Sequence, residues 1–243
     1  MKSNIKETAQ AFINKLKSIT FPQSVTCDFC GNDIFKNQKP AICEKCLLNL
    51  PFITNACKKC GKELVGSKCE DCSFYRTYFD QASAVFNFDE QIQHAVHRFK
   101  YGGEFHLKRT FSYFLFHKFA TLNWNVDCVI AVPMNKDKEI LRIKNQALEL
   151  ANEFCTLTKL ENASESVIKL KTQSQTKLTR KERFKNAQNS LKVVNSKLFK
   201  RKNVLIIDDI FTTGATTNAL ANLLKTYGAN KVYILTIATV PST

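Results

Sequence analysis

Residues 204–217 read VLIIDDIFTTGATT, and this stretch decides both the fold and the first candidate site. Its first four residues are bulky and apolar, which predicts a buried β-strand, and an amphipathic pattern from Ala219 onward predicts a helix directly after it. Between the two lies a turn of small and hydroxyl residues around Gly214. Backbone N–H groups converge at a helix N-terminus, so this turn is expected to bind an anion such as a phosphate group.

Two adjacent carboxylates, Asp208 and Asp209, stand at the polar end of this predicted strand. They would repel a phosphate unless they bind hydroxyl groups or a cation, and ribose hydroxyls or Mg²⁺ would meet that need. Thr212, Thr213 and Thr216 could add hydroxyl donors to the phosphate oxygens. The simpler alternative is that the carboxylates only cap the helix and the threonines only form a turn. The pattern as a whole favours the phosphate site.

The alternation of strand and helix patterns continues on both sides of this stretch. Further strands are predicted at 82–88, 127–133 and 232–240, and amphipathic helices at 92–99, 140–154 and 219–227. Such alternation indicates an α/β domain with a parallel sheet, in which ligands bind at the carboxyl ends of the strands.

Eight of the ten cysteines lie between residues 27 and 72 and form four C-x-x-C pairs. Two such pairs supply the four sulfur ligands of a closed tetrahedral zinc site, so two structural Zn²⁺ ions are expected. The predicted ligands are Cys27, Cys30, Cys43, Cys46, Cys57, Cys60, Cys69 and Cys72. Sequential pairing, with the first four on one ion and the last four on the other, is favoured because each half then closes as a short ribbon. The spacing leaves interleaved pairing open.

The chain of 243 residues carries 36 Lys and Arg against 21 Asp and Glu, a formal net charge of +15, which predicts anionic partners. A hydrophobic fraction of 44% excludes a disordered chain. The apolar runs are shorter than the roughly 18 to 20 residues that a membrane-spanning helix needs. Residues 1–20 show neither the apolar stretch nor the cleavage site of a signal peptide. A cytoplasmic protein is therefore expected.

The segment 204–217 resembles the phosphoribosyl pyrophosphate signature of type I phosphoribosyltransferases, and the chain from about 25 to 240 resembles the ComF/GntX family. Other family landmarks are FKYGGE at 99–104, IAVPM at 130–134, RIKNQA at 142–147 and QTKLTRKERFKNA at 175–187. The chain departs from the family pattern in two places. Lys169 and Lys171 stand where an arginine is common, which keeps the charge, and Ile143 and Lys144 stand where Gly-Phe is usual. A change of loop geometry is expected there.

The resemblance implies a role for each part of the predicted site. Asp208 and Asp209 would hold the ribose hydroxyls of phosphoribosyl pyrophosphate, directly or through Mg²⁺. The 5-phosphate would lie against Phe211, Thr212, Thr213, Gly214, Ala215 and Thr216. The pyrophosphate would lie near Pro133, Met134, Asn135 and Lys136. Transfer would proceed by loss of pyrophosphate from C1 and attack by an acceptor, and the sequence contains no motif that identifies this acceptor.

Between Lys169 and Lys202 the chain has 12 basic residues and only one acidic residue, Glu182. A run of one sign repels itself unless an anion neutralises it, so this window is expected to meet a phosphate backbone. A basic-aromatic segment at 97–109 contains Phe99, Tyr101 and Phe105, whose rings could stack on bases. The alternative is that these rings are core and the lysines only aid solubility. The candidate nucleic-acid residues are Arg98, Lys100, Tyr101, Arg180, Lys181, Arg183 and Lys185.

The family association with natural transformation favours single-stranded DNA as the partner, with a DNA-uptake helicase or recombination proteins as further partners. The expected domains are an amphipathic helix at 1–24, a double zinc ribbon at 25–76 and a phosphoribosyltransferase-like domain at 82–243. The favoured function is DNA uptake with a phosphoribosyl pyrophosphate-type site. The alternatives are an active phosphoribosyltransferase in nucleotide metabolism and a zinc-ribbon adaptor for protein partners.

Overall fold

The computed structural model describes residues 25–34, 40–64, 66, 68–134, 144–170 and 179–240. The chain forms two compact units, the first ending at Asn49 and the second beginning at Leu50. The amphipathic helix expected at 1–24 lies outside the described residues, and the domain boundaries expected from the sequence stay a prediction. No helix in the described part of the chain is both long and apolar enough to cross a membrane.

The first unit is built around a short ribbon and a short helix. Strands β1 (Val25–Thr26) and β2 (Asp33–Ile34) pair antiparallel, and helix α2 (Glu44–Leu48) follows. Cys43 is the N-cap of α2, and its sulfur accepts a hydrogen bond from the backbone N–H of Cys46. The helix and the ribbon turn thus each carry two of the predicted metal ligands.

The second unit contains a parallel sheet, as the sequence predicts. Within the described residues it has five strands in the order β3-β9-β8-β4-β5, and every neighbouring pair is parallel. The strands are β3 (Gln81–Asn87), β4 (Cys128–Ala131), β5 (Glu161–Asn162), β8 (Asn203–Phe211) and β9 (Lys231–Thr239). Four of them coincide with the predicted strands, whereas β5 is too short to give a pattern.

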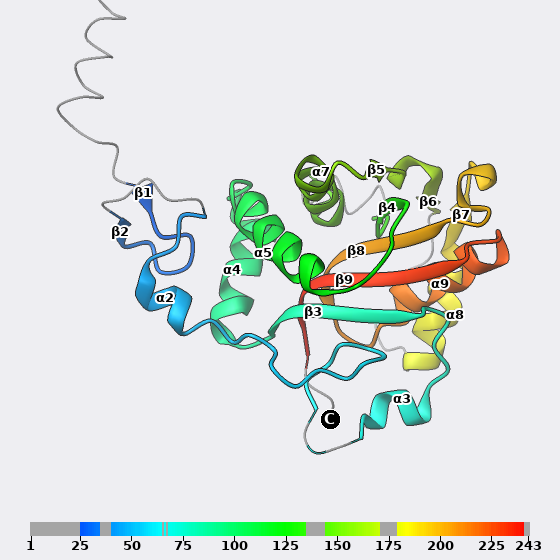
Figure 1. Cartoon of the computed structure of the whole chain (residues 1–243), viewed down its shortest axis with the longest axis horizontal. Helices are drawn as coiled ribbons and strands as arrows, with labels where there is room; N and C mark the ends of the chain where they lie inside the picture. Colours follow the sequence, from blue (N-terminus) through cyan, green and yellow to red (C-terminus); the bar gives the residue numbers. More distant parts are fainter. Residues whose placement is uncertain are drawn as a thin grey trace, which may run out of the picture. The chain divides into compact units, whose positions relative to one another are not determined.

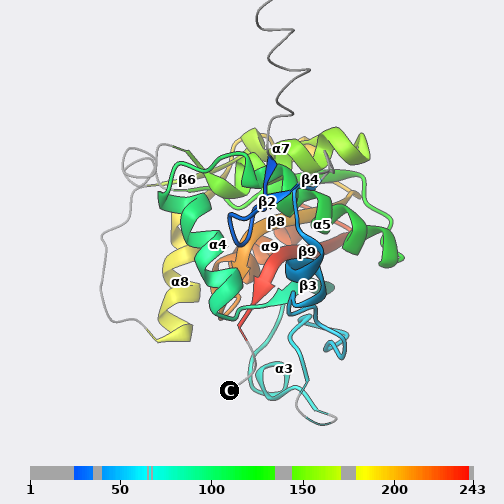
Figure 2. The ribbon, with the colours of Figure 1, turned by 90° about the vertical axis from the view of Figure 1, so that its left-hand side faces the viewer.

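Helices cover both faces of this sheet (Figure 1). Helices α5 (Leu107–Thr121) and α7 (Gln146–Thr158) contact one face, and α9 (Ala215–Thr226) contacts the other, with α8 (Arg180–Ser190) packed against α9. Figure 2 shows α5 on one side of the strands and α8 on the other. Burial on two faces explains why residues 204–207 of β8 are all apolar and fully buried.

The remaining elements are connections between the strands of the sheet and its helices. Helix α4 (Glu90–Tyr101) follows β3, and its Asp89 N-cap accepts from the N–H of Ile92. Strands β6 (Val167–Lys169) and β7 (Leu191–Val193) form an antiparallel pair, flanked by the 3₁₀ turns η1 (Ser164–Ser166) and η2 (Ser196–Phe199). A capping box of Thr179 and Glu182 starts α8.

The second cysteine-rich segment lies along the outer edge of the sheet. Phe52 forms an antiparallel bridge with Phe86 of β3, and the N–H of Ile53 donates to the carbonyl of Val85 at 3.2 Å. The N–H of Ala82 donates to the carbonyl of Lys59 at 2.8 Å. Because β3 is the edge strand, these bonds satisfy groups that an open edge would leave free to pair with another chain.

Gly61 packs closely against the backbone of β3. Its replacement tests the contact between this segment and the sheet. We expect Gly61→Ala to destabilise the second unit by about 2–4 kcal/mol, because a positive φ strains any Cβ and the new atom overlaps backbone. At Gly61 the added Cβ would lie 2.6 Å from Ser83 Cα, whereas at Gly31, with the same φ of +74°, it meets nothing within 4 Å. Gly31→Ala is therefore the matched control: its strain of about 1 kcal/mol falls in the first unit, so the midpoint of the second unit should stay unchanged.

The measurement is thermal unfolding followed by the fluorescence of Trp124, the only tryptophan of the chain. Its ring stacks on Tyr233 of β9 at 4.7 Å, and its Nε1 donates to Gln81 of β3 at 2.6 Å, so it reports on the sheet itself. Equal midpoints for the two variants would contradict the close packing of Gly61 on β3.

Candidate phosphoribosyl site and cysteine tetrads

The main cavity lies where the strand order of the sheet reverses. From β4 the chain passes through α7 to β5 on one side, and from its neighbour β8 it passes through α9 to β9 on the other side. The loops that follow β4 and β8 therefore diverge and open a crevice at the carboxyl ends of the strands. The sequence places its polar residues after the same two strands.

This cavity has a volume of about 490 Å³ and is lined by residues of all these segments. Of the predicted site residues, it brings together Asp208, Asp209, Phe211, Thr212, Thr213, Gly214, Ala215, Thr216, Pro133 and Met134. Asn135 and Lys136 lie outside the described residues. The cavity also has lining residues to which the sequence assigned no role here, namely Lys100, Asn145, Gln146, Lys169, Arg183 and Asn186.

The two carboxylates at the end of β8 occupy different electrostatic environments. Asp209 forms an ion pair with Lys100, with 2.5 Å between Oδ2 and Nζ, and both side chains are largely buried. Asp208 is more costly to ionise, because burial and then the neighbouring charge of Asp209 raise the pKa of its carboxyl to about 7. The N–H of Asp209 donates to Asp208 Oδ1 at 2.9 Å and favours the charged form.

The loop after β8 presents the start of α9 to the cavity. Gly214 is the N-cap of α9 with a φ of +69°, and as a glycine it has no side chain that could cap the helix. The hydroxyl of Thr217 donates to the carbonyl of Gly214 at 3.1 Å, and Thr213 Oγ1 accepts from the N–H of Ala215 at 3.3 Å. The uncapped end can offer its N–H groups to an anion.

The ring of Phe211 packs directly against this loop at Gly214. Its side chain is buried, and a Cβ at Gly214 would lie 2.4 Å from Phe211 Cζ. The first clash of any larger residue at 214 is with the ring of Phe211, so Gly214 is required for the packing of the loop on this ring.

The predicted aromatic-basic segment 97–109 is divided between three environments. Phe99 is fully buried, so its expected stacking on bases is wrong and the ring belongs to the core. Lys100 points to Asp209 in the cavity, as described above. Arg98 pairs with Glu104 at 2.7 Å, while the ring of Tyr101 is 55% exposed. Only Tyr101 keeps the surface position that contact with a base requires.

The comparison with known proteins agrees with this geometry. Residues 140–243 match the family model of the phosphoribosyl transferase domain. Competence protein F of Haemophilus influenzae is 26% identical over 87% of this chain and 96% of that protein. Competence protein ComFC of Streptococcus pneumoniae is 28% identical over 82% of this chain and 88% of that protein. Over most of its length the chain is thus similar to ComF-type competence proteins, and its residues 140–243 match the phosphoribosyl transferase domain.

A solved structure with a similar fold is the glutamine phosphoribosylpyrophosphate amidotransferase from Bacillus subtilis complexed with ADP and GMP. It is 16% identical with a TM-score of 0.42, and the match covers 58% of this chain and 30% of that one.

The chain also contains two cysteine tetrads, and they group sequentially. Cys27, Cys30, Cys43 and Cys46 form one group, and Cys57, Cys60, Cys69 and Cys72 form the other, with all sulfurs of a group within 4.8 Å of one another. This is the pairing that the sequence favoured over interleaving. Either group could hold a metal ion. The first tetrad belongs to the first unit and the second to the second unit.

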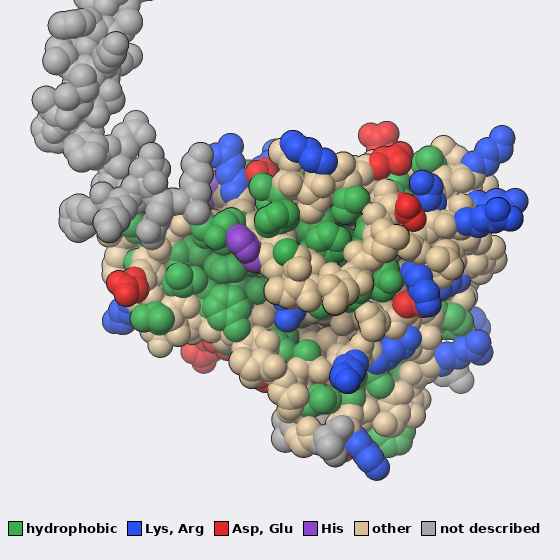
Figure 3. All heavy atoms as spheres, in the orientation of Figure 1, with side chains coloured by type: hydrophobic (Ala, Val, Ile, Leu, Met, Phe, Trp, Pro, Cys, Tyr) green, Lys and Arg blue, Asp and Glu red, His purple; other side chains and the backbone are tan. Residues whose placement is uncertain are grey.

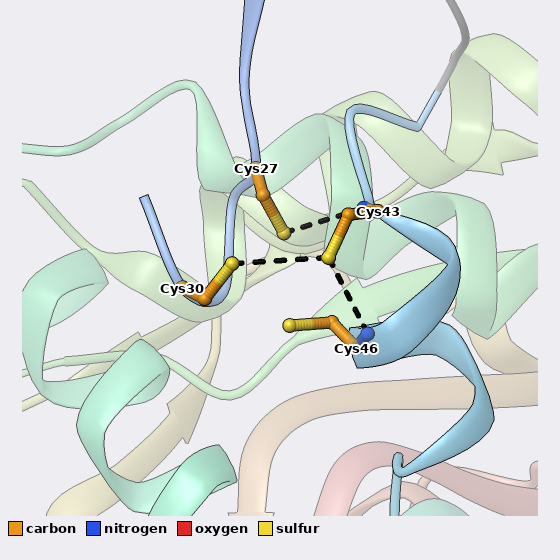
Figure 4. Close-up of side chains that lie close together, drawn as sticks. All are labelled: Cys27, Cys30, Cys43 and Cys46. Atoms are coloured by element: carbon orange, nitrogen blue, oxygen red, sulfur yellow. Dashed lines mark hydrogen bonds between the residues drawn. The ribbon is translucent and has the colours of Figure 1, made fainter. Parts of the chain in front are cut away.

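Figure 4 shows the four sulfurs of the first tetrad turned toward a common centre. The backbone N–H of Cys43 donates to the sulfur of Cys27 at 3.4 Å, and the sulfurs of Cys30 and Cys43 are 3.8 Å apart. In the second tetrad, burial and the charge of Cys72 raise the pKa of Cys60 above its usual range. Crowded thiols of this kind ionise together only around a cation, which fits a divalent metal with four sulfur ligands.

The basic window at 169–202 does not form one surface. Lys169 and Arg183 line the cavity at the carboxyl ends of the strands. Lys200, Arg201 and Lys202 precede Asn203, the first residue of β8. Strand β8 rises about 3.3 Å per residue, so these three basic residues lie roughly 25 Å from the cavity. Figure 3 shows Lys and Arg side chains gathered at the right-hand end, where β8 and β9 begin.

Proposed function

We propose that this protein acts in DNA uptake during natural transformation, binding single-stranded DNA and carrying a Mg²⁺-dependent site for phosphoribosyl pyrophosphate. The observation that carries the proposal is the cavity between β4 and β8. Two carboxylates, an uncapped helix N-terminus and Lys100 converge there. Anionic, cationic and hydroxyl-binding groups in one crevice suit a ligand that has both phosphates and a sugar.

In this proposal each wall of the cavity binds one part of the ligand. Asp208 and Asp209 accept hydrogen bonds from the ribose hydroxyls, and the start of α9 binds the 5-phosphate. Lys100, Lys169 and Arg183, which also line the cavity, neutralise the pyrophosphate. Mg²⁺, when bound, would supply further positive charge to the leaving pyrophosphate. Fixed groups that balance the charge in this way would provide most of any acceleration.

We further propose that the two tetrads bind structural Zn²⁺. All four positions of each site are sulfurs, so neither site has a place for a reacting water molecule. The second site stabilises the segment that covers the edge of the sheet.

Single-stranded DNA is proposed to contact the basic residues of α8, beside the cavity. Arg183 and Lys185 are exposed on this helix, and Arg180 and Lys181 belong to the same segment. Phosphates held at α8 would lie close to the phosphoribosyl site, so the two ligands are expected to compete or to influence each other.

Active phosphoribosyl transfer is the second candidate function. A cavity of about 490 Å³ falls in the range of sites for small molecules. Release of pyrophosphate during incubation with phosphoribosyl pyrophosphate, Mg²⁺ and candidate acceptors would support it.

Titration with a labelled single strand at several salt concentrations tests DNA binding, and matched charge pairs locate it. We expect Arg183→Gln with Lys185→Gln to weaken binding and to flatten the plot of log affinity against log salt by about 1.4, because each phosphate contact contributes about 0.7. Lys200→Gln with Lys202→Gln removes the same charge at the other end of the sheet and should leave the slope nearly unchanged. Addition of phosphoribosyl pyrophosphate with Mg²⁺ should alter the affinity of the wild type.

Two results would contradict these assignments. Equal losses in the two charge pairs would show that binding depends on net charge alone. Failure of phosphoribosyl pyrophosphate to bind in calorimetry with Mg²⁺ would exclude the proposed site.

A further inference from the structure

A second cavity of about 390 Å³ lies behind the phosphate loop, within the second unit. One wall is the segment that leaves the second tetrad, which includes the short helix α3 (Glu70–Phe74). The other walls are α8 and the start of α9. Six aromatic residues line it, of which Phe79 and Phe211 are buried. We call it the aromatic groove after the four that are not buried, together with one arginine: Phe74, Tyr75, Tyr78, Phe184 and Arg76.

The aromatic groove shares a wall with the phosphoribosyl cavity. Phe211, Thr213, Gly214 and Ala215 line both cavities. Helix α8 also faces both, because it contributes Arg183 to the first cavity and the next residue, Phe184, to the groove. A strand that follows α8 could therefore place phosphates on one side of the helix and bases on the other.

The groove is held in a fixed geometry by the helix that begins at the phosphate loop. Asn218 of α9 accepts from the N–H of Tyr78 at 2.6 Å and donates from Nδ2 to the carbonyl of Arg76 at 3.0 Å. The rings of Tyr78 and Phe184 lie parallel within 10° at 5.7 Å. The guanidinium of Arg76 lies over the ring of Tyr78 at 5.1 Å. Stacked rings with an arginine are the elements with which single-strand binders hold bases.

Two further rings in the groove are open to solvent. Phe74 is 78% exposed and Tyr75 is 45% exposed. An exposed phenylalanine loses the stabilisation that burial would give, so a ring displayed beside a cavity is typical of a binding surface. The charge of the groove fits an anionic partner, because Lys62 and Asp71 neutralise each other at 2.7 Å and Arg76 adds a positive charge.

We propose that the aromatic groove stacks the bases of single-stranded DNA whose phosphates lie along α8. The inference rests on the proposed DNA binding and adds the site of base contact. The groove does not hold the acceptor of phosphoribosyl transfer, because the loop at 211–215 separates it from the place where C1 of the ribose would react. Phe74 and Tyr75 take the stacking role that the sequence had assigned to the buried Phe99.

The test compares a labelled oligo-dT strand with an abasic strand of equal length, which has the same phosphates and no bases. Phe74→Ala with Tyr75→Ala should weaken binding of oligo-dT on the order of tenfold, with the salt slope unchanged, because stacking does not release counterions. The same double variant should bind the abasic strand as the wild type does. Tyr227→Ala is the matched control, because Tyr227 is an exposed ring, 40% accessible, at the far end of α9.

The possible outcomes distinguish failure of the proposed base-stacking groove from failure of the proposed DNA binding. A wild type that binds oligo-dT and loses nothing in the double variant would overturn the groove and leave DNA binding standing. Equal weakening of oligo-dT and abasic strands by the double variant would also overturn it, because the rings would then not act on bases. A wild type that binds neither strand would overturn both proposals. Phe74→Trp should retain the affinity, and an unchanged Trp124 midpoint in Phe74→Ala with Tyr75→Ala would exclude unfolding as the cause.

Discussion

Cys60→Ser should remove one bound metal ion and lower the unfolding midpoint of the second unit by roughly 10 °C, whereas Cys43→Ser should remove one ion and leave that midpoint unchanged. Both variants change one ligand of four, but in different units of the chain. The difference follows from the place of the second tetrad. Lys59 and Gly61, on either side of Cys60, contact the backbone of β3 and of the residues just before it.

The size of the effect follows from what the metal holds in place. Structural zinc sites contribute apparent binding energies of about 10–16 kcal/mol at neutral pH, part of which stabilises the surrounding fold. If a few kcal/mol of this reach the sheet, the midpoint falls by about 2–4 °C for each kcal/mol in a domain of this size.

The experiment uses elemental analysis for zinc and the fluorescence of Trp124 for the sheet. The wild type should contain two zinc ions and each variant one. Equal midpoints for Cys60→Ser and the wild type would show that the second tetrad does not support the sheet. Less than one zinc per chain in the freshly reduced wild type would contradict the metal assignment.

Asp208→Asn should make the unliganded protein more stable than the wild type at pH 8 and should abolish the thermal shift caused by phosphoribosyl pyrophosphate with Mg²⁺. Burial and the charge of Asp209 raise the pKa of Asp208 from 3.8 to about 7 in the folded protein. The folded state therefore keeps a proton that the unfolded state releases between these values. Stability is highest below the lower value and falls as the pH rises to about 7.

The asparagine variant has no such proton, so its stability should change less across this range. At 1.36 kcal/mol for each pKa unit, the upper limit of the difference at pH 8 is roughly 4 kcal/mol. Asp209→Asn is the matched control. It leaves Lys100 without the carboxylate that lies 2.5 Å from its Nζ, and no comparable gain is expected.

Urea unfolding at pH 5 and pH 8, with and without ligand, measures both effects. An Asp208→Asn variant that is less stable than the wild type at pH 8 would show that the Asp208 carboxylate does not destabilise the fold. A variant whose midpoint still responds to phosphoribosyl pyrophosphate would show that Asp208 does not bind this ligand. A gain in stability with a loss of binding is the expected signature of a carboxylate retained for function.

The parallel sheet and the carboxylate end of β8 could be predicted because their signals are local. Residues 204–207 are buried on both faces and read as an apolar run, and Asp208 follows them directly. Helix α5 gives no such signal, although its buried residues Phe111, Phe114 and Leu115 keep helical spacing. Large aromatic residues on its other sides blur this pattern: Tyr113, Phe116 and Phe119.

The role of Lys100 could not be predicted from its neighbours in sequence. It lies between a buried phenylalanine and an exposed tyrosine, and only the fold brings it to Asp209, more than one hundred residues later. The aromatic groove has the same origin, because Tyr78 and Phe184 come from distant segments. Three other cavity residues, Asn145, Gln146 and Arg183, could have been predicted. They lie in the family landmarks at 142–147 and 175–187, and these landmarks were the sequence signal for a role in the site.

The cover over β3 links metal supply to self-association. Strand β3 carries the sequence QASAVFN, which is apolar and free of charge, and it forms one edge of the sheet. An uncharged, exposed edge is a template for pairing with a second chain. The segment that carries the second tetrad covers this edge, and zinc bound to its cysteines, as proposed above, would keep it in place. In a cell short of zinc, or under oxidants that attack thiolates, such chains would be expected to accumulate as aggregates before they lose their ligand site.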